Sequence, residues 1–371
     1  MKLDDLPTPC LVLDRTILQR NLDAMGLAVA RLGVALRPHM KTAKSIDVAR
    51  MVLANPYGRT QGITVSTLAE AEYFAGHGIT DIIYAVGITP QKLDQVAKLN
   101  AAGANVMVIT DDVDCAGDIA AHLSPPRTLI EIDCGEHRGG VDPDDPALPE
   151  IADRLGNFLA GVLTHAGHSY AGRSNAEMAR IAEAERVAAV RAAETLAHAG
   201  FSCPIISAGS SPTALHAERL DGVTEIRAGV YMFGDLFQAE IGTHAEDNIA
   251  LTVLTSVIGR RPADRRVLVD AGALALSKDR STEDAPHDFA YGLVLDLQGR
   301  RSFGRTLVRR VYQEHGLAEF PSDSALPNLP VGAKLRIAPN HVCLTSAAHD
   351  RYFVVDGDDT VVAVWPRVNG W

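Results

Sequence analysis

Short apolar runs alternate with helical segments eight times between residues 34 and 231, and this alternation restricts the fold more than any other feature of the sequence. The runs are residues 34–36, 62–67, 81–87, 105–110, 128–134, 159–165, 205–207 and 224–231. Strands that are separated by helices usually pair in parallel. Eight such units in roughly 220 residues fit a (β/α)8 barrel, the TIM-like fold. A doubly wound open sheet is the alternative.

The predicted helices end where the sequence offers a cap. They cover residues 15–32, 46–53, 68–78, 91–102, 113–123, 146–155, 175–199 and 212–220. Four of them end at or next to a glycine, at positions 78, 103, 156 and 200. Glycine adopts the left-handed conformation that closes a helix, so these boundaries support the alternation.

Beyond residue 237 the pattern changes to shorter runs separated by turn signals such as Asp356-Gly357. The runs are residues 249–258, 266–269, 289–297, 305–313, 334–338, 352–355 and 360–365. They predict a β-rich domain, to which an entry strand at residues 8–14 is expected to belong. The predicted organisation is therefore α/β, with a barrel over residues 15–240 and a β domain over residues 1–14 and 241–371.

The composition narrows the class of function. The chain has 371 residues, of which 47% are hydrophobic and 22% charged, which is enough apolar material for two folded domains. The net charge of −11 argues against a nucleic-acid surface, which needs a basic face. The five cysteines show no paired spacing, and we find neither a signal peptide nor a membrane-spanning run. We therefore expect a cytoplasmic protein with no nucleic-acid or membrane partner.

In a (β/α)8 barrel the functional residues gather where the strands end. The first predicted strand leads to Lys41, which is thereby placed at the rim. A lysine that reacts covalently needs a neutral amine, and desolvation or a cationic neighbour lowers its pKa. Arg37, His39 and Lys44 are candidate neighbours. A solvated loop lysine is the alternative interpretation.

Two later strand ends suit a phosphate group. Gly209-Ser210-Ser211 follows the seventh strand and leads into a helix, whose free N–H groups and dipole attract anions. Gly229-Val230 follows the eighth strand and can present further backbone donors. Loops after strands seven and eight are the usual phosphate site of such barrels. A turn with a helix cap is the alternative.

A rim lysine, a phosphate site and an arginine together suggest pyridoxal 5′-phosphate, which forms a Schiff base with a lysine. Arg227 is placed to contact the ring nitrogen of the cofactor and, having no proton to give, to keep it unprotonated. His165, at the end of the sixth strand, is placed to stack on the ring. A buried, hydrogen-bonded core histidine is the alternative for His165.

A second candidate site is the late stretch over residues 339–343. If this stretch is a strand, His341 and Cys343 face the same side, because residues two apart do so. Imidazole and thiolate both bind zinc, and two protein ligands leave coordination positions open for a substrate. His315 is a further candidate, with a solvated loop histidine as its alternative.

Seven stretches carry a family resemblance: residues 37–42, 62–72, 135–141, 164–170, 227–231, 313–316 and 339–343. Together they resemble the fold-type III pyridoxal-phosphate enzymes, the alanine-racemase-like family. Within that family the chain is most similar to the metal-dependent branch of D-serine dehydratases, D-threo-3-hydroxyaspartate dehydratases and D-threonine aldolases. The resemblance implies a head-to-tail homodimer with shared active sites. It also implies that Lys41 carries the cofactor and that His341 and Cys343 bind a divalent metal.

The same resemblance implies further roles around the cofactor. Arg138 is expected near its phenolic oxygen and Arg227 near its ring nitrogen, while Tyr170 belongs to the cofactor-binding set. The thiolate of Cys343 favours zinc, with manganese, magnesium or cobalt as alternatives. His-x-Cys is the pattern of the dehydratases, whereas the aldolases usually have His-x-Asp, and the catalytic tyrosine motif of the racemases is missing.

The expected reaction is loss of water from a 3-hydroxy-D-amino acid of the D-threo-3-hydroxyaspartate or D-serine type, giving a 2-oxo acid and ammonia. Lys41 acts as the base, and the metal activates the β-hydroxyl as a Lewis acid. An aldolase on the same scaffold is the nearer alternative, and a non-catalytic pyridoxal-phosphate-binding protein is the remoter one. Arg173 and Arg280 are candidates for holding the second carboxylate of hydroxyaspartate.

Overall fold

The chain divides into two compact units in a computed structural model that describes residues 1–322 and 327–371. The barrel unit comprises Asp23–Gly229 with Gly370–Trp371, and the β unit comprises Met1–Leu22 with Val230–Asn369. The units are divided by how compactly their residues pack. One boundary follows Leu22, inside the first long helix, and the other follows Gly229, directly after the eighth barrel strand. The domain limits predicted from the sequence differ, because they rest on the change in secondary-structure pattern. They are 15–240 for the barrel and 1–14 with 241–371 for the β domain, and they stay a prediction.

Eight parallel strands build the barrel unit, one for each apolar run of the sequence. They are β2 (Ala35–Pro38), β4 (Ile63–Val65), β5 (Asp81–Gly87), β6 (Asn105–Thr110), β7 (Thr128–Ile132), β8 (Leu159–Thr164), β9 (Ile205–Ala208) and β10 (Glu225–Ala228). From β4 to β10 each strand pairs with the next, and β10 pairs with β2. A bridge between His39 and Thr64 links β2 to β4, so the order returns to its start. The short β3 (Arg59–Thr60) pairs with β2. The predicted TIM-like barrel is confirmed.

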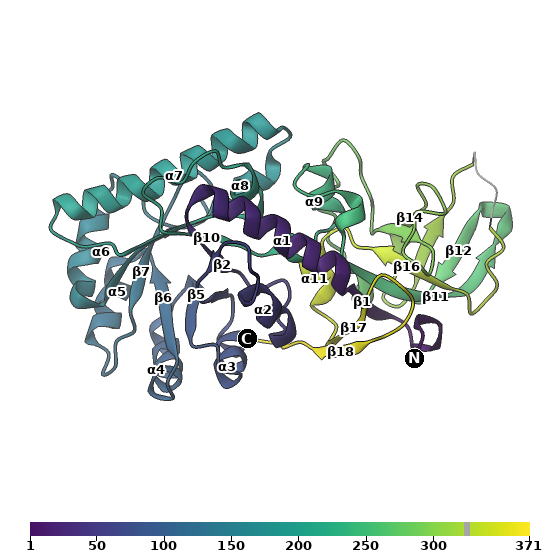
Figure 1. Cartoon of the computed structure of the whole chain (residues 1–371), viewed down its shortest axis with the longest axis horizontal. Coiled ribbons are helices and arrows are strands. Elements are labelled where there is room, and N and C mark those ends of the chain that lie inside the picture. The colour runs from purple at the N-terminus through teal and green to yellow at the C-terminus, as the bar shows by residue number, and fades with distance from the viewer. Residues whose placement is uncertain (323–326) are drawn as a thin grey trace. The chain divides into compact units, whose positions relative to one another are not determined.

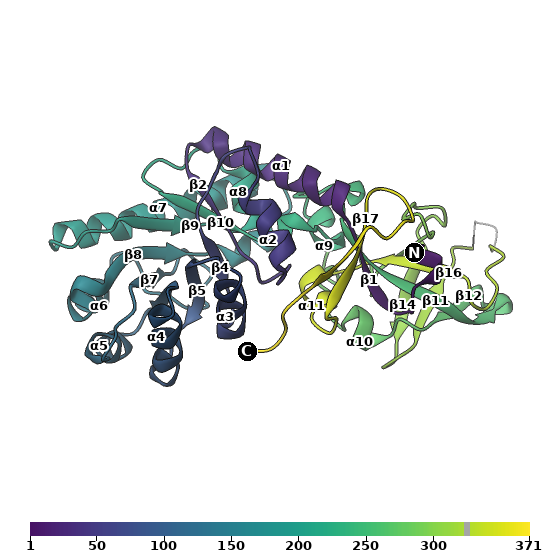
Figure 2. The ribbon, with the colours of Figure 1, turned by 60° about the horizontal axis from the view of Figure 1, so that its bottom comes forward.

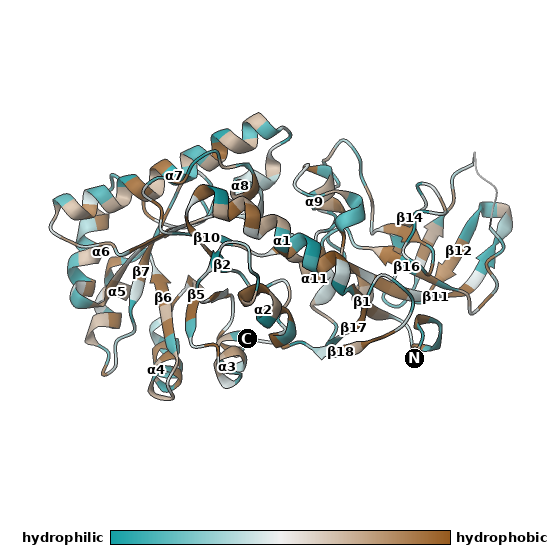
Figure 3. Ribbon diagram, viewed as in Figure 1, coloured by the Kyte–Doolittle hydropathy of each residue, from teal (hydrophilic) through white to brown (hydrophobic). Residues whose placement is uncertain are grey.

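Helices alternate with the barrel strands, and five of them contact the strands directly (Figures 1 and 2). The helices are α1 (Arg15–Leu32), α2 (Ile46–Leu53), α3 (Leu68–Gly76), α4 (Leu93–Ala101), α5 (Val113–Ala121), α6 (Ala147–Leu155), α7 (Asn175–His198) and α8 (Ser211–His216). The four glycines expected to close helices all have positive φ, at 88°, 100°, 52° and 92°. Figure 3 shows polar and apolar residues alternating along α7, as expected for a helix with one face against the sheet.

A chain of charged and polar side chains runs through the barrel unit from β2 to β10. Arg37 is 0% exposed and donates through Nε to both carboxylate oxygens of Glu225, at 2.9 and 2.8 Å. Its Nη1 also meets Asp81 at 2.9 Å. Ser207 donates to Glu225 at 2.6 Å and accepts from Arg227 at 2.7 Å. These bonds fix the guanidinium of Arg227, one of the predicted site residues.

The β unit is a largely antiparallel sheet with short helices. Its strands, in spatial order, are β12 (Arg266–Val269), β15 (Gly316–Glu319), β14 (Leu307–Val311), β13 (Leu293–Leu295), β16 (Lys334–Ala338), β11 (Leu251–Arg261), β1 (Cys10–Asp14), β17 (Arg351–Val355) and β18 (Ala363–Pro366). Because β12 also pairs with β11, the first six strands of this order form a closed ring. The helices are α9 (Leu236–Glu240), α10 (Ala273–Leu276) and α11 (Val342–Ser346).

The sequence prediction for the β unit is confirmed in most of its elements. The entry strand β1 pairs with β11 in antiparallel and with β17 in parallel fashion, so it belongs to this unit. The prediction missed β15, because Gly316–Glu319 has four residues, begins with glycine and contains one large apolar side chain, Leu317. It also placed residues 339–343 on a strand, whereas β16 ends at Ala338 and α11 begins at Val342.

At Gly161 the strands β8 and β9 pack too closely for any side chain. Gly161 has φ 140°, and a Cβ atom there would lie 1.9 Å from the carbonyl oxygen of Ile205 on β9. We predict that Gly161→Ala lowers the free energy of unfolding by at least about 1–3 kcal/mol in urea titrations, because strand and neighbour must move apart. Gly117→Ala is the control: it lies in α5 with open space around it and should stabilise by about 0.5–1 kcal/mol. Equal effects of the two changes would contradict the packing argument.

Candidate functional site

Lys41 lies in the turn that follows β2, with its side chain exposed. The turn is closed by the N–H of Lys44, which donates to the carbonyl of Met40 at 2.7 Å. The backbone N–H of Lys41 faces Nδ1 of His39 at 3.4 Å. The structure therefore places Lys41 at the strand end where the sequence predicted it.

The three candidate neighbours of Lys41 differ in the partners that they contact. Arg37 is engaged by Glu225 and Asp81, and the Lys44 ammonium pairs with the buried Glu70 at 3.0 Å. Burial, and then the charges of Lys41 and Arg227, hold the pKa of His39 well below its ordinary value. His39 is thus a neutral neighbour, and the other two cations are neutralised by carboxylates.

His165 is a neutral imidazole in the same electrostatic neighbourhood. Burial, and then the charge of Lys41, lower the pKa of His165 to about 3, although its bond to Gly209 opposes the shift. Its Nδ1 lies 2.9 Å from the carbonyl oxygen of Gly209 and must therefore carry the proton, because a carbonyl only accepts. The ring of Tyr170 lies with its centroid 6.4 Å away.

Arg227 lies buried at the end of β10, 4% exposed. Besides its bond to Ser207, it donates through Nη2 to the carbonyl oxygen of Thr164 at 2.6 Å. Burial lowers its pKa, and the charges of Glu225 and Glu185 oppose that shift. The charges of Lys41 and Arg227 both lower the pKa of His165, which is the electrostatic sign that these three predicted residues are neighbours.

The predicted phosphate loop begins α8 and is rich in hydroxyl groups. Ser210 is the N-cap residue: its Oγ accepts from the N–H of Thr213 at 3.1 Å and lies 2.9 Å from Oγ of Ser169. The N–H of Ser210 donates to the Thr213 hydroxyl at 2.9 Å. The turn-and-cap interpretation is therefore correct for Ser210. Hydroxyl donors gathered at a helix start also suit a phosphate, and Ser211 follows directly.

Close packing requires the two glycines of the predicted phosphate site. Gly209 has φ 125°, and a Cβ atom there would lie 2.6 Å from the carbonyl oxygen of Arg227. At Gly229 a Cβ atom would lie 2.7 Å from the carbonyl oxygen of His39. Gly229 closes the barrel unit, and Val230 opens the β unit in a 3-10 turn over Val230–Met232.

The sequence prediction missed Glu185, which joins the His165 loop to the Ser210 loop. Its Oε1 accepts from the N–H of Ala166 at 2.7 Å and from the N–H of Gly209 at 3.0 Å. Burial raises the pKa of this carboxyl group, while the bonds that it accepts oppose the shift. A sequence signal existed: Glu185 lies on the apolar face of α7, in helical spacing with Ile181, Ala182 and Ala189.

Arg138 lies on the loop after β7 between two carboxylates. Its guanidinium is 3.7 Å from Glu131 and 3.8 Å from Glu136, and its side chain is 58% exposed. Glu136 also accepts from the N–H of Gly167 at 3.1 Å. The Arg138 loop is thus held against the loop that follows His165.

His341 and Cys343 lie together at the start of α11 in the β unit, for a reason other than the one predicted. His341 is the N-cap residue of the helix, and Cys343 is its second residue. The residues are neighbours because they share one helical turn, and a side-chain hydrogen bond joins them. Asp235 holds this turn from α9, since its Oδ2 accepts from the N–H of Val342 at 2.9 Å.

The imidazole of His341 is oriented by a carboxylate. Its Nδ1 bonds to Asp279, which also accepts from the hydroxyl of Ser281 at 2.8 Å. Burial lowers the pKa of His341, but the bond to Asp279 and the neighbouring Cys343 outweigh it and raise the pKa to about 11. Histidines that bind metals commonly donate their other ring nitrogen to a carboxylate, so the donor set fits a divalent ion on Nε2.

Within residues 1–322 and 327–371 no cluster of three or more His, Cys, Asp or Glu side chains could hold a metal ion. A metal at His341 and Cys343 would therefore keep open positions, as a catalytic ion requires.

Two further candidate residues of the β unit are His315 and Arg280. His315 is exposed. Arg280 is engaged by Glu283 at 2.7 Å and by Asp288 at 2.6 Å, which leaves it poorly suited to a substrate carboxylate.

Arg173 belongs to the barrel unit, on the segment that leads from η4 (Gly167–Ala171) to α7. Its Nη1 donates to the carbonyl oxygens of Tyr170 at 3.2 Å and of Gly172 at 3.0 Å. Unlike Arg280 it has no carboxylate partner among these bonds, so Arg173 stays a candidate for a second substrate carboxylate.

The chain matches the models of two protein domains, one after the other along the sequence. The chain belongs to the alanine-racemase-like family of fold-type III pyridoxal-phosphate enzymes: the model of the alanine racemase N-terminal domain matches residues 13–236. The model of the serine dehydratase domain matches residues 250–355. Among the described residues no helix is long and apolar enough to cross a membrane.

The chain is also similar, over almost its whole length, to several characterised enzymes. The chain is 44% identical to D-threo-3-hydroxyaspartate dehydratase of Delftia sp. HT23, over 99% of this chain and 98% of the relative. The solved structure of that dehydratase matches with a TM-score of 0.95 over 100% of both chains. D-serine dehydratase of Dictyostelium discoideum is 28% identical over 100% and 98% of the two chains. The 3-hydroxy-D-aspartate aldolase of Paracoccus denitrificans is 30% identical over 99% and 92%.

Glu185 yields a testable prediction about the loops that carry His165 and Ser210. We predict that Glu185→Ala lowers the free energy of unfolding by about 2–5 kcal/mol, because two buried N–H groups lose their acceptor. Glu183→Ala on the same helix is the matched control, because Glu183 pairs with Arg186 and Arg219 at the surface and should cost at most about 1 kcal/mol. Urea titrations followed by circular dichroism measure both, and similar losses would refute the assignment.

Proposed function

We propose that the protein is a pyridoxal-phosphate- and divalent-metal-dependent dehydratase that converts a 3-hydroxy-D-amino acid to a 2-oxo acid and ammonia. The observation that carries the proposal is the full-length similarity to D-threo-3-hydroxyaspartate dehydratase at 44% identity, which is well above the 28% and 30% of the D-serine dehydratase and aldolase relatives. D-threo-3-hydroxyaspartate is therefore the first candidate substrate, and D-serine the second.

The residues of the barrel unit would perform the proton chemistry. Bound pyridoxal phosphate supplies a sink for the electrons of the Cα–H bond. Lys41 would hold the cofactor through its amine and then accept the α-proton. Arg227 presents only N–H donors, fixed by Ser207 and Thr164, and would leave the ring nitrogen without a proton. Ser210 and Ser211, with the backbone at Gly209, Gly229 and Val230, would hold the phosphate.

The residues of the β unit would supply the metal. His341 and Cys343 would hold the ion, and Asp279 would orient the imidazole. One solved structure of a D-threo-3-hydroxyaspartate dehydratase, 43% identical to this chain, is of a variant in the metal-free form, which supports metal use in that enzyme. The thiolate of Cys343 favours zinc over manganese, magnesium or cobalt. The metal would act as a Lewis acid on the β-hydroxyl group and so assist its departure.

The proposal includes an assembly and a location. Family resemblance favours a homodimer with shared active sites, and the five free cysteines are consistent with a reducing cytoplasm. The aldolase relatives keep retro-aldol cleavage as the second candidate reaction, because they match the chain over nearly its whole length.

The products separate the two reactions. We predict that D-threo-3-hydroxyaspartate and D-serine yield ammonia and a 2-oxo acid, with the aspartate derivative giving the higher kcat/KM. Lys41→Ala should lower kcat by about 10²–10⁴-fold, as loss of a positioned base does, and should abolish the absorbance band of the lysine-bound cofactor. Release of glycine and an aldehyde would establish the aldolase instead.

Metal dependence has its own test at Asp279. Asp279→Ala should weaken zinc binding about 10–100-fold, because partners that orient a metal-binding imidazole contribute that much. Calorimetric titration of chelator-treated protein with zinc measures the affinity. Asp284→Ala, an exposed aspartate on the same segment, is the control and should leave it unchanged. Full activity in excess chelator would reject the metal.

A further inference from the structure

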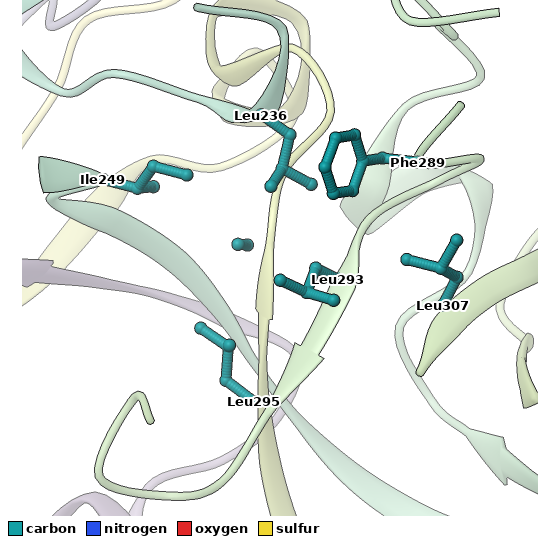
Figure 4. Close-up of a cluster of buried hydrophobic side chains, with 7 residues drawn as sticks. Leu236, Ile249, Phe289, Leu293, Leu295 and Leu307 are labelled. Carbon is teal, nitrogen blue, oxygen red and sulfur yellow. The ribbon is translucent and has the colours of Figure 1, made fainter. Parts of the chain in front are cut away.

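A cavity of about 510 Å³ in the β unit is separate from the residues assigned to the cofactor and the metal. Its inner wall is apolar and belongs to a cluster of buried side chains (Figure 4). The members that line the cavity are Leu236, Ile249, Leu293, Leu295 and Ala338. Its volume falls in the range of sites for small molecules.

A buried arginine lines the same cavity. Arg336 on β16 is 5% exposed, and its Nε donates to the hydroxyl of Thr252 at 2.8 Å. Gly299 makes room for it, since a Cβ atom there would lie 2.8 Å from Nη1 of Arg336. In the described part of the chain no carboxylate forms an ion pair with Arg336, and burial lowers its pKa to about 10 despite the charges of Asp14 and Asp296. An unpaired buried guanidinium is costly and is well suited to bind a carboxylate.

A buried carboxylate of opposite charge lines the cavity as well. Asp14 is 6% exposed, and its Oδ1 caps α1 by accepting from the N–H groups of Thr16 at 2.9 Å and Ile17 at 3.1 Å. Oδ2 of Asp14 takes part in neither of these two hydrogen bonds. Asp14 is the largest source of negative potential on Arg336, yet the two charges do not form an ion pair with each other. The cavity thus holds a cation and an anion that are both nine-tenths buried and remain apart.

The exposed rim adds little net charge. Arg301 pairs with Glu246 at 2.8 Å, and Arg300 pairs with Asp296 at 3.0 Å. A dianion such as a phosphate monoester would therefore meet one unpaired guanidinium and a nearby carboxylate. A ligand with one negative and one positive group matches the two buried charges better, because each end then meets its opposite.

We propose that this cavity binds a free α-amino acid with an aliphatic side chain. Its carboxylate pairs with Arg336, its ammonium group faces Asp14, and its side chain packs on Leu236, Ile249 and Leu293. The site is independent of the proposed reaction, because it needs neither Lys41 nor the metal residues. Its ligand class follows from the opposed charges and the apolar wall.

The probe is L-leucine, titrated into the full-length holoenzyme by calorimetry. We expect saturable binding that Arg336→Gln and Asp14→Asn each weaken about tenfold or more, since each removes a charged partner. Arg310→Gln, which changes an exposed arginine on β14 that does not line the cavity, should leave the affinity unchanged. Lys41→Ala should leave it unchanged too, which separates this cavity from the cofactor site and keeps the test independent of the proposed function.

Two further measurements keep the proposal falsifiable if the buried variants fail to fold. Ala245→Trp places a large ring at the exposed rim, where it should block the cavity and abolish leucine binding without disturbing the core. 4-Methylpentanoate, which lacks the ammonium group, and 3-methylbutylamine, which lacks the carboxylate, should each bind at least about tenfold more weakly than leucine. Absence of leucine binding, unchanged affinity in Ala245→Trp, or equal binding of either analogue would overturn the proposal.

Discussion

The buried ion pair between Arg37 and Glu225 is the interaction on which the barrel site depends. Arg37 and Arg227 are direct partners in the register of β2 and β10, and two like charges opposite each other repel. Glu225 lies on the same strand as Arg227 and meets Arg37 directly, while Ser207 joins it to Arg227. Without this carboxylate two guanidinium groups would be buried side by side, and breaking such a pair costs about 3–5 kcal/mol.

Buried carboxylates also fix the segments that carry the other predicted site residues. Glu185 holds two loops by their N–H groups, Asp235 holds the turn of His341, and Glu70 neutralises Lys44. Each carboxylate accepts several bonds in a place from which water is excluded, so each has one favourable arrangement. The reactive candidates Lys41 and His341 are therefore carried on segments whose backbone is fixed by residues that take no part in the chemistry.

The sequence predicted the barrel well because the information was local. Each apolar run, each helical period and each closing glycine can be recognised within a few residues, and the eight strands form in chain order. Lys41, His165 and Arg227 could be proposed as neighbours because parallel strands end at one rim. The roles of the individual site residues remain proposals, since they depend on groups that the chain must bind.

The errors arose where distant segments decide the structure. Nothing near Arg37 in the sequence shows that it will pair with Glu225 and Asp81, so it could be named only as a candidate cationic neighbour of Lys41. His341 was predicted to lie on a strand, whereas Asp235 on the distant α9 accepts a hydrogen bond from the N–H of Val342 and so supports a helix start. Glu185 was overlooked because its helical period was used only to assign α7. Asp14 and Arg336 line one cavity only once the sheet has formed, because their strands β1 and β16 lie on either side of β11.

The position of β1 has a consequence for the synthesis of the chain. This strand is made before the barrel strands, but it lies between β11 and β17, and its Leu11 pairs with Val253 and Tyr352. The barrel unit is almost complete once Gly229 has been made, whereas the sheet of the β unit must wait for the last strands. The growing chain therefore carries this apolar strand unpaired until β11 has been made, and one edge of the strand stays open until β17 has been made. Such an edge is open to wrong pairing, so chaperones that shield nascent chains have a defined segment to protect.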